Sequence, residues 1–349
     1  MKRVLVTGAG GPAGVNFIRS LRSAKEKFFI AGSDMNKYRI ELPDVDKRYL
    51  VPANSDPSYI RILNSIIEKN KIEFVHPQPD VEVRFLSDNR EKINAKVFLP
   101  KRDTVRICQD KLETALRWKK AGIPVPESME VGDEQGLKKA AKEFGYPFWF
   151  RATQGAGARG STQVPNLDVG ISWLKYWRAR GMTWKFMAQE YLPGQNIAFQ
   201  SVWNRGEVVC SQARERIEYI YPYLAPSGIT GTPAVAKTIV DQEINDIATR
   251  CVKCIDSEAT GIFCVDLRRN KDGVPCPTEI NTGRFFTTSF FFTKAGINMP
   301  YIYIKLGFGE PIPKIKQYDI VDEGVYWIRH MDSEPKLIRE GDWTSEKTF

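Results

Sequence analysis

Residues 261–281 read GIFCVDLRRNKDGVPCPTEIN, and this stretch decides more about the fold than any other part of the chain. Its Asp-Gly pair at 272–273 is a strong signal for a two-residue turn between two strands. Counting outward from that turn places Asp266 directly opposite Glu279. Glu279 and Asn281 are two residues apart, so their side chains share a face.

The hairpin therefore presents three oxygen-bearing side chains together, while the apolar side chains of its first strand face a core. Two carboxylates directly opposite each other repel, and a cation between them removes that repulsion. Hard oxygen ligands without His or Cys suit Mg²⁺ rather than Zn²⁺. The predicted metal ligands are Asp266, Glu279 and Asn281, and the predicted core residues are Phe263, Val265 and Leu267.

The alternative is an exposed hairpin with ordinary polar residues. Pro275 and Pro277 lie in the second strand and cannot donate backbone hydrogen bonds, so that strand is predicted to be an edge strand or a bulged one.

Composition limits the classes of protein to which the chain can belong. Its 349 residues suit two or three domains, and 42% hydrophobic with 27% charged residues is ordinary for a globular protein. No apolar run is long enough for a membrane helix, and the N-terminus enters a strand directly, so we expect no signal peptide, no membrane partner and a cytoplasmic location. The net charge of +9 suits anionic ligands, but the basic residues are scattered and no nucleic-acid partner is expected.

Six cysteines include a C-x-x-C pair, Cys251 and Cys254. Both belong to an apolar stripe with helical spacing over 244–255, and no second such pair exists. Buried reduced thiols are therefore expected rather than zinc ligands or a disulfide.

Strands and helices alternate over residues 1–103, which predicts a parallel sheet with crossover helices. Strands are expected at 4–6, 28–33, 74–75 and 96–99. Further along, helices are expected at 110–121, 134–144 and 241–257, and strands at 147–151, 186–190, 197–203 and 208–212.

A first glycine loop, Gly8 to Gly14, follows the first strand and precedes a helix, with Asp34 twenty residues beyond it. This arrangement matches a dinucleotide-binding fingerprint, and an NAD enzyme is one alternative. The Tyr-x-x-x-Lys pair at Tyr301 and Lys305 lies too far along the chain to support it. The loop equally suits a domain that binds another anion at the helix N-terminus.

A second glycine loop follows an apolar strand that ends in Arg151. Glycines let backbone N–H groups approach phosphate oxygens, and an arginine at the strand end adds fixed charge. A mobile surface loop is the alternative. The loop residues predicted to contact phosphates are Gln154, Gly155, Gly157, Gly160 and Ser161. Downstream, the strand at 186–190 runs into Pro193-Gly194, where backbone groups can pair with an adenine edge.

These features occur in an order that resembles the ATP-grasp superfamily, in particular members similar to the carbamoyl-phosphate synthase large subunit. The resemblance covers roughly residues 1–310. The motifs that carry it are Asp110-Lys111, GIPVP at 122–126, YPFWFR at 146–151, the second glycine loop, QEYLPG at 189–194, Asp266, and Glu279-Ile-Asn281.

The resemblance implies an α/β fold in which a Rossmann-like domain precedes a two-lobed α+β ATP-grasp domain. The implied organisation is an N-terminal domain over 1–105, a lid or small lobe over 106–190, a body with the metal hairpin over 191–312, and a tail packed on the body over 313–349.

The resemblance also implies roles for individual residues. Lys111 and Arg151 would contact phosphates, and the glycine loop would form a lid. Arg284 would neutralise the transferring phosphoryl group. ATP and Mg²⁺ are the implied cofactors, with two ions expected and Mn²⁺ a possible substitute, and Glu279 would bridge the ions. The adenine would be held by Gln189, Glu190, Tyr191 and Leu192.

Two positions depart from the family pattern. Asn196 stands where many members have a glutamate for the ribose hydroxyls. The segment at 226–233, with Gly228 and Thr230, resembles the carboxyphosphate loop of carbamoyl-phosphate synthases, but Thr230 stands near where those enzymes carry histidine. This difference puts bicarbonate in doubt as the activated acid.

Candidate substrate residues follow two strands. The segment after the strand at 74–75 lies at the carboxyl end of the parallel sheet, where ligands bind in open α/β folds. For the segment after the strand at 74–75, the alternative is a proline-stiffened turn with solvated polar residues. For the arginines after the strand at 208–212, the alternative is an ordinary surface position. The candidates are His76, Gln78, Asp80 and Glu82 in the first group and Arg214 and Arg216 in the second.

The expected activity is that of a carboxylate–amine ligase, or a carboxylate–thiol ligase, working through an acyl phosphate with release of ADP and phosphate. Small-molecule carboxylates and amines are the expected partners, and a homodimer is compatible with the sequence. The alternatives are an enzyme that activates bicarbonate as carbamoyl-phosphate synthases do, and a nucleotide-binding protein without turnover.

Overall fold

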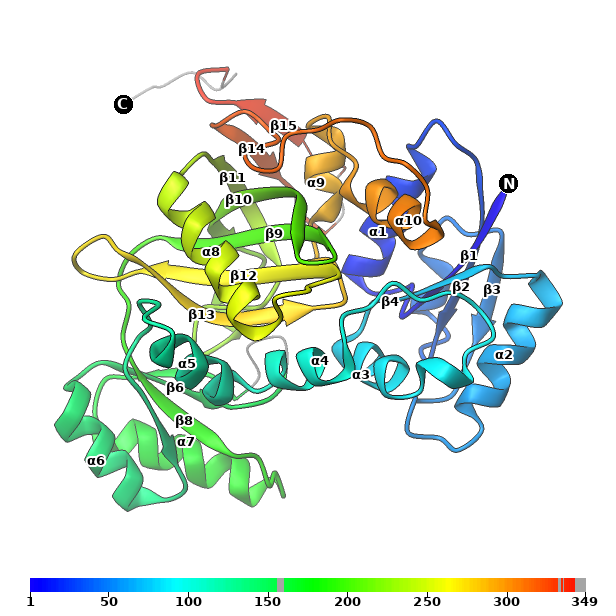
Figure 1. Cartoon of the computed structure of the whole chain (residues 1–349). Coiled ribbons are helices and arrows are strands. Elements are labelled where there is room, and N and C mark those ends of the chain that lie inside the picture. The colour runs from blue at the N-terminus through cyan, green and yellow to red at the C-terminus, as the bar shows by residue number, and fades with distance from the viewer. Residues whose placement is uncertain (156–159, 332–333, 335, 343–349) are drawn as a thin grey trace.

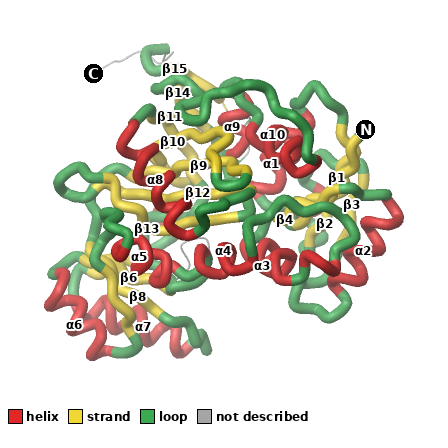
Figure 2. Tube along the Cα trace, in the orientation of Figure 1, coloured by secondary structure: helices red, strands yellow, loops and turns green. Residues whose placement is uncertain are grey.

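The computed structural model describes residues 1–155, 160–331, 334 and 336–342. Within these ranges the chain forms three β-sheets with helices packed on their faces (Figures 1 and 2). In the view of Figure 1 the N-terminal sheet lies to the right, a seven-stranded sheet in the centre and a small sheet at the lower left.

The N-terminal sheet is parallel, with the strand order β3-β2-β1-β4, so the predicted parallel α/β domain is confirmed. Apolar side chains of both faces form its cores. Its strands are β1 Lys2–Thr7, β2 Phe28–Asp34, β3 Lys47–Leu50 and β4 Phe74–Pro77, and its helices are α1 Pro12–Arg22, α2 Tyr59–Asn70 and α3 Asp80–Asp88.

The strand predicted over 96–99 is wrong beyond its first residue. Lys96 forms a single parallel bridge with Phe74, and the chain then leaves the sheet. α10 closes over this edge, since a Cβ at Gly307 would lie 3.1 Å from the Cβ of Phe98 and even nearer to the Phe74 ring. Packing against a helix therefore replaces strand pairing here.

The small sheet is antiparallel, in the order β5-β8-β6-β7. Two helices cover it and bury an aromatic-rich core. Its strands are β5 Ser128–Val131, β6 Phe148–Ala152, β7 Thr162–Val164 and β8 Phe186–Glu190, and its helices are α6 Glu134–Phe144 and α7 Leu167–Ala179. Two further helices, α4 Arg102–Cys108 and α5 Lys111–Lys120, lie between the N-terminal sheet and this one (Figure 1).

The large sheet is antiparallel, in the order β13-β12-β9-β10-β11-β14-β15. One face packs on α8 and the other on α9, α10 and α1. Its strands are β9 Asn196–Asn204, β10 Glu207–Tyr219, β11 Pro233–Ile239, β12 Gly261–Arg269, β13 Pro275–Thr282, β14 Val325–Ile328 and β15 Lys336–Arg339; the helices are α8 Gln242–Ile255, α9 Ser289–Lys294 and α10 Met299–Phe308.

The β12–β13 hairpin confirms the predicted pairing of Asp266 with Glu279. The prediction of a two-residue turn is wrong. The turn is longer, because the Asn270 N–H donates to the Val274 carbonyl at 2.9 Å and closes it there. A bulge at Thr278 then adds one residue to β13 and restores the predicted register. β13 is also the edge of its sheet, as its prolines predicted.

The prediction of buried reduced thiols is confirmed for Cys251, whereas Cys254 is only half-buried. All six are free thiols, and Cys251 lies in the buried stripe of α8, where burial raises its pKa. Among the helices of the described residues, none combines the length and the low polarity that a membrane span needs.

Candidate functional site

A cavity of about 970 Å³ opens where the three sheets meet. The segments that follow β1 and β4 line one side, the small sheet and the start of α5 line another, and the open face of the large sheet forms the floor. Most of the predicted site residues lie on its walls: Gln78, Asp80, Lys111, Arg151, Gln154, Gly155, Ser161, Gln189, Glu190, Tyr191, Leu192, Asn196, Arg214, Arg216, Thr230, Asp266, Glu279, Asn281 and Arg284.

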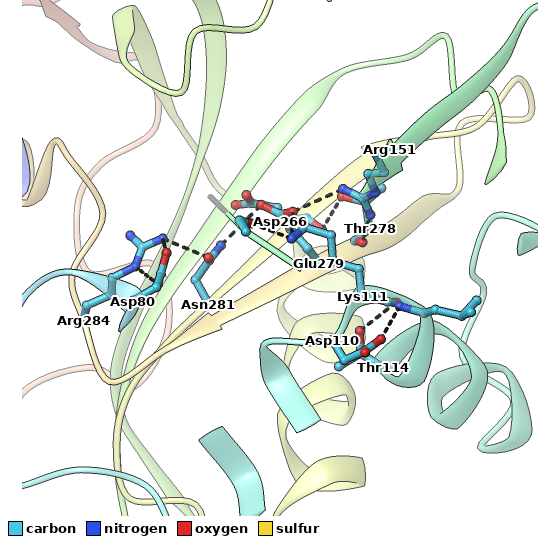
Figure 3. A network of polar contacts seen from close by, with 12 residues as sticks. Asp80, Asp110, Lys111, Thr114, Arg151, Asp266, Thr278, Glu279, Asn281 and Arg284 are labelled. Atoms are coloured by element: carbon cyan, nitrogen blue, oxygen red, sulfur yellow. Dashed lines mark hydrogen bonds and ion pairs between the residues drawn. The ribbon is translucent and has the colours of Figure 1, made fainter. Parts of the chain in front are cut away.

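The carboxylate pair lies on the two outermost strands at one edge of the large sheet, and both residues line the cavity (Figure 3). Burial raises the pKa of Asp266, and the neighbouring Glu279 adds to this, although Arg216 opposes both. Burial would also raise the pKa of Glu279, but Lys111 and Arg151 outweigh it and hold that pKa well below its usual range. Glu279 is therefore the member of the pair that stays ionised under all ordinary conditions.

Two cations, the buried Arg151 and the largely buried Lys111, converge on Glu279 from outside the hairpin. Arg151, at the end of β6, places Nη1 3.1 Å from Glu279 Oε2 and also donates to the Thr278 carbonyl. Lys111, at the start of α5, places Nζ 3.7 Å from the same oxygen. Burial lowers the pKa of both cations, and Glu279 opposes that change. The start of α5 and the end of β6 are thus both tied to the large sheet by ion pairs with the Glu279 carboxylate.

The start of α5 is fixed to the second glycine loop. Asp110 caps the helix by accepting from two backbone N–H groups, and its other oxygen accepts from Gln154 Nε2 at 3.2 Å. The Lys111 N–H donates to the Thr153 carbonyl at 2.9 Å, and Nζ donates to the Gly155 carbonyl at 2.8 Å. These hydrogen bonds fix Lys111, the predicted phosphate ligand, against the start of the second glycine loop.

Arg284 follows β13 and reaches across to the N-terminal domain (Figure 3). Its guanidinium contacts both oxygens of Asp80, at the first position of α3, with Nη2 3.1 Å from Oδ2. The same Nη2 lies 2.9 Å from Asn281 Oδ1. Burial alone would lower the pKa of Arg284, but Asp80 outweighs it and the pKa is raised.

The donor set fits a hard divalent cation. Two carboxylates face each other, and Asn281 lies beside Glu279, with its Nδ2 3.4 Å from Glu279 Oε1. Among the described residues no group of three or more His, Cys, Asp or Glu side chains is placed to hold a metal, so the site depends on the carboxamide and on ligand oxygens. Such a site suits Mg²⁺ with phosphate oxygens rather than Zn²⁺.

The segment after β8 provides a backbone edge at the other end of the cavity. Gln189 is buried, and its Nε2 donates to the Ser128 hydroxyl at 2.9 Å. The Glu190 N–H donates to the Glu127 carbonyl at 2.9 Å. Leu192 is buried against the cavity wall.

The remaining loop residues are placed as follows. Asn196 accepts from Arg216 Nη1 at 3.1 Å, and Thr230 donates its hydroxyl to the Ile220 carbonyl at 2.8 Å. Gly160 accepts from Trp173 Nε1 at 3.1 Å. Gly160 and Gly228 are not among the described residues that line the cavity, and Gly157 lies outside the described residues.

His76 and Glu82, expected to contact substrate, are instead buried in the N-terminal domain and do not line the cavity. His76 stacks on Phe17 with ring centroids 3.9 Å apart, its Nε2 lies 2.9 Å from Gln78 Oε1, and burial lowers its pKa to about 4. His76 belongs to β4, and its ring packs against Phe17 of α1 instead of lining the cavity. The sequence did not predict the helix α3, and Glu82 lies in its first turn on the buried side of the helix.

Replacing Glu82 by Gln will remove a pH-dependent loss of stability. Burial raises the pKa of Glu82 to about 7, and Asp34 adds to this. The folded state therefore keeps a proton that the unfolded state has released, and stability falls as pH rises from about 4.5 to about 7. The cost above pH 7 is on the order of 3 kcal/mol.

Urea unfolding of both proteins at pH 5 and pH 8 measures the difference. Subtracting variant from wild type cancels the contribution of His76, which titrates in an overlapping range. The exposed Glu91→Gln is the matched control. A difference that is the same at both pH values contradicts the assignment.

The first glycine loop is closed on itself. Asp34, the expected ribose-binding acid, is buried and accepts from the Gly10 N–H at 3.0 Å and the Asn36 N–H at 2.9 Å. A Cβ at Gly10 would lie 2.3 Å from the Arg39 carbonyl oxygen, so the glycine permits close packing of the chain. The carboxylate that an NAD site would use is occupied within the loop.

Two residues in or beside the cavity, Phe286 and Arg329, were not predicted from the sequence. Phe286 lines the cavity below the guanidinium of Arg214, 4.0 Å from Cζ to the ring centroid. Arg329, just after β14, donates to the Pro233 carbonyl at 2.9 Å and the Thr287 carbonyl at 3.2 Å, and so ties two cavity walls together. An arginine directly after an apolar strand was the one available hint.

Comparison with known proteins adds to this geometry. Residues 4–98 match the model of the PylC-like N-terminal domain, and residues 108–288 match that of the ATP-grasp domain. One pyruvate carboxylase subunit, from Methanothermobacter thermautotrophicus, is 29% identical over 48% of this chain and 35% of its own length. The chain therefore spans about a third of that relative.

Solved structures share the fold at low identity. A biotin carboxylase from Campylobacter jejuni superposes with a TM-score of 0.70 at 18% identity, over 93% of this chain and 74% of its own. An L-amino acid ligase from Bacillus licheniformis gives 0.70 at 14% identity, over 94% and 79%. Since the ATP-grasp model covers just over half of the 349 residues, the chain belongs to the ATP-grasp family.

Proposed function

We propose that the chain is an ATP-dependent ligase that joins a carboxylate to an amine through an acyl phosphate. The observation that carries the proposal is the meeting of two cations, Lys111 and Arg151, on a carboxylate that faces a second one in a single cavity. Paired carboxylates next to fixed cations suit a metal-bound triphosphate.

In this proposal Lys111 and Arg151 bind the phosphates, and the second glycine loop covers them. The backbone edge from Glu190 to Leu192 holds the adenine, and Asn196 contacts the ribose. Mg²⁺ would be held by Asp266, Glu279 and Asn281, where it would neutralise charge on the transferring phosphoryl group. Arg284, fixed by Asp80, adds a further positive charge at that point.

The chemistry has two steps. A carboxylate oxygen of the acid attacks the γ-phosphorus, the bond to the β-phosphate oxygen breaks, and ADP leaves. The amine nitrogen then attacks the acyl carbon, the bond to the phosphate oxygen breaks, phosphate leaves, and the nitrogen loses a proton. The residues position reactants and neutralise charge, and closure of the glycine loop over the phosphates would keep water from the acyl phosphate.

Two structural neighbours support different acids. The L-amino acid ligase favours an organic acid, and the biotin carboxylase domain of a Hydrogenobacter thermophilus 2-oxoglutarate carboxylase, solved with MgADP and bicarbonate, favours bicarbonate. Thr230, which stands near where carbamoyl-phosphate synthases carry histidine and whose hydroxyl donates to a backbone carbonyl, favours the organic acid.

Measuring ADP release tests the proposal. Purified protein with Mg·ATP is supplied with a mixture of amino acids, then with halved mixtures until one acid and one amine remain. We expect ADP release that depends on both. Release with bicarbonate and ammonia alone would instead identify a carbamoyl-phosphate-type enzyme, and nucleotide binding without any ADP release would identify a binding protein.

A further inference from the structure

Arg214 is a buried cation for which the described residues supply no acceptor at Nε or Nη1. It lies on β10, only 1% of its surface is exposed, and it lines the cavity. Its Nε and Nη1 are buried with no hydrogen-bond partner among the described residues. Its guanidinium lies over the ring of Phe286, which offers a π face and no oxygen.

Such a group is costly to keep in a folded protein. A buried charge that lacks a hydrogen-bonding counterpart loses its hydration without replacement. The environment resists the charge, since burial and the neighbouring Arg216 lower the pKa of Arg214 to about 9. An arginine kept there at this cost indicates a ligand that supplies the missing acceptors.

The other arginines of this wall are already satisfied. Arg216 donates to Asp266 and to Asn196. Arg329 donates to two backbone carbonyls that belong to the cavity wall. Of these three cations, Arg214 is the one that lines the cavity and has two donors, Nε and Nη1, without a hydrogen-bond partner among the described residues.

Strand register separates Arg214 from the phosphate end of the site. Glu279 pairs with Asp266, Asp266 with Ala198, and Ala198 with Arg214, so all four side chains rise from one face in a row across four strands. Arg214 and Asp266 are two strands apart, about 10 Å between their backbones. Lys111 and Arg151 contact the opposite end of the row, at Glu279.

We propose that Arg214 anchors a subsite for the carboxylate of the acid substrate, beside the metal carboxylates and on the far side from the cations that hold the triphosphate. The inference rests on the proposed function and adds where its acid binds. A planar carboxylate matches a guanidinium because it accepts two parallel charge-assisted hydrogen bonds. Phe286 supports the flat face of the guanidinium and leaves its edge to the ligand.

Calorimetric titration of the full chain tests this subsite. The probes are sodium acetate, glycine and bicarbonate, each added with and without Mg·ADP, and inorganic phosphate as a tetrahedral anion. We expect wild type to bind at least one carboxylate saturably, Arg214→Met to weaken that binding at least tenfold, and Arg214→Lys to fall between them. The Kd of Mg·ADP should change less than twofold in both variants.

Thermal unfolding provides a second readout that a purely structural arginine would not give. Because Arg214→Met removes an unsatisfied buried charge and keeps an apolar contact with Phe286, the Tm should rise. The exposed Arg61→Met on α2 is the matched control and should change neither readout.

Three results would overturn the subsite: equal carboxylate binding by wild type and Arg214→Met, no carboxylate binding by wild type at tens of millimolar, or a lower Tm together with lost Mg·ADP binding in both Arg214 variants. Tighter binding of phosphate than of any carboxylate would reassign it to a phosphate group. Failure of the proposed function is distinguishable, because it shows as no Mg·ADP binding or no ADP release by wild type.

Discussion

Replacing Glu279 by Gln will reduce ADP formation roughly 10²–10³-fold, the loss expected when a charged group that organises a transition state is neutralised. The carboxylate lies opposite Asp266 and within 3.1 Å of Arg151 and 3.7 Å of Lys111. The isosteric amide keeps the shape of the side chain but removes the charge that two cations contact and that the proposed Mg²⁺ would need. Steady-state ADP release at saturating Mg·ATP measures the effect.

A magnesium titration locates the cause. If Glu279 holds the metal, the variant will need far more Mg²⁺ for half-maximal nucleotide binding, and binding of free nucleotide will change little. Glu113→Gln on the exposed face of α5 is the matched control. An unchanged magnesium dependence in Glu279→Gln would contradict the metal assignment even if activity fell.

The same variant carries a prediction for pH. Because Lys111 and Arg151 hold the pKa of Glu279 well below its usual range, its ionised form stabilises the fold above the unfolded pKa, near 4.5. That stabilisation is lost as pH falls below this value. Glu279→Gln should therefore be less stable than wild type at pH 7, and the difference should shrink as the solution is acidified.

The hairpin shows why part of this site could be predicted from the sequence. Strand periodicity fixed which residues share a face, and Asp266 does oppose Glu279. The reasoning nevertheless assumed a two-residue turn, whereas the turn at 270–274 is longer and a bulge at Thr278 compensates for it. The prolines of β13 predicted a bulge or an edge but not its position, because a bulge depends on tertiary contacts such as the hydrogen bond from Arg151 to the Thr278 carbonyl.

Residues that depend on packing between distant segments could not be predicted. His76 precedes a proline turn and carries titratable chemistry, yet α1 covers it through Phe17. Arg329 lies more than forty residues beyond Thr287, which it contacts. Arg214 was identified as a candidate, but its lack of partners follows only from the positions of Phe286, Arg216 and the cavity wall. Sequence patterns predict which side chains share a face of a strand or helix. They do not predict which hydrogen-bond donors lack a partner after distant segments have packed together.

Replacing Arg284 by Lys will lower kcat roughly 10²-fold, because an ammonium cannot contact Asp80 and Asn281 simultaneously as the guanidinium does. Asp80→Asn should lower kcat less, about tenfold, since the carboxylate acts by positioning the arginine. Asp103→Asn, exposed on the neighbouring α4, is the matched control and should have no effect.

The double variant separates positioning from independent action. If Asp80 works through Arg284, combining Asp80→Asn with Arg284→Lys will lower kcat no further than Arg284→Lys alone, because residues that act as a unit are not additive. Additive losses would show that Asp80 acts independently of Arg284. Since Asp80 begins α3 of the N-terminal domain and Arg284 follows β13, non-additivity would also show that the first domain controls the geometry of the phosphoryl end of the cavity.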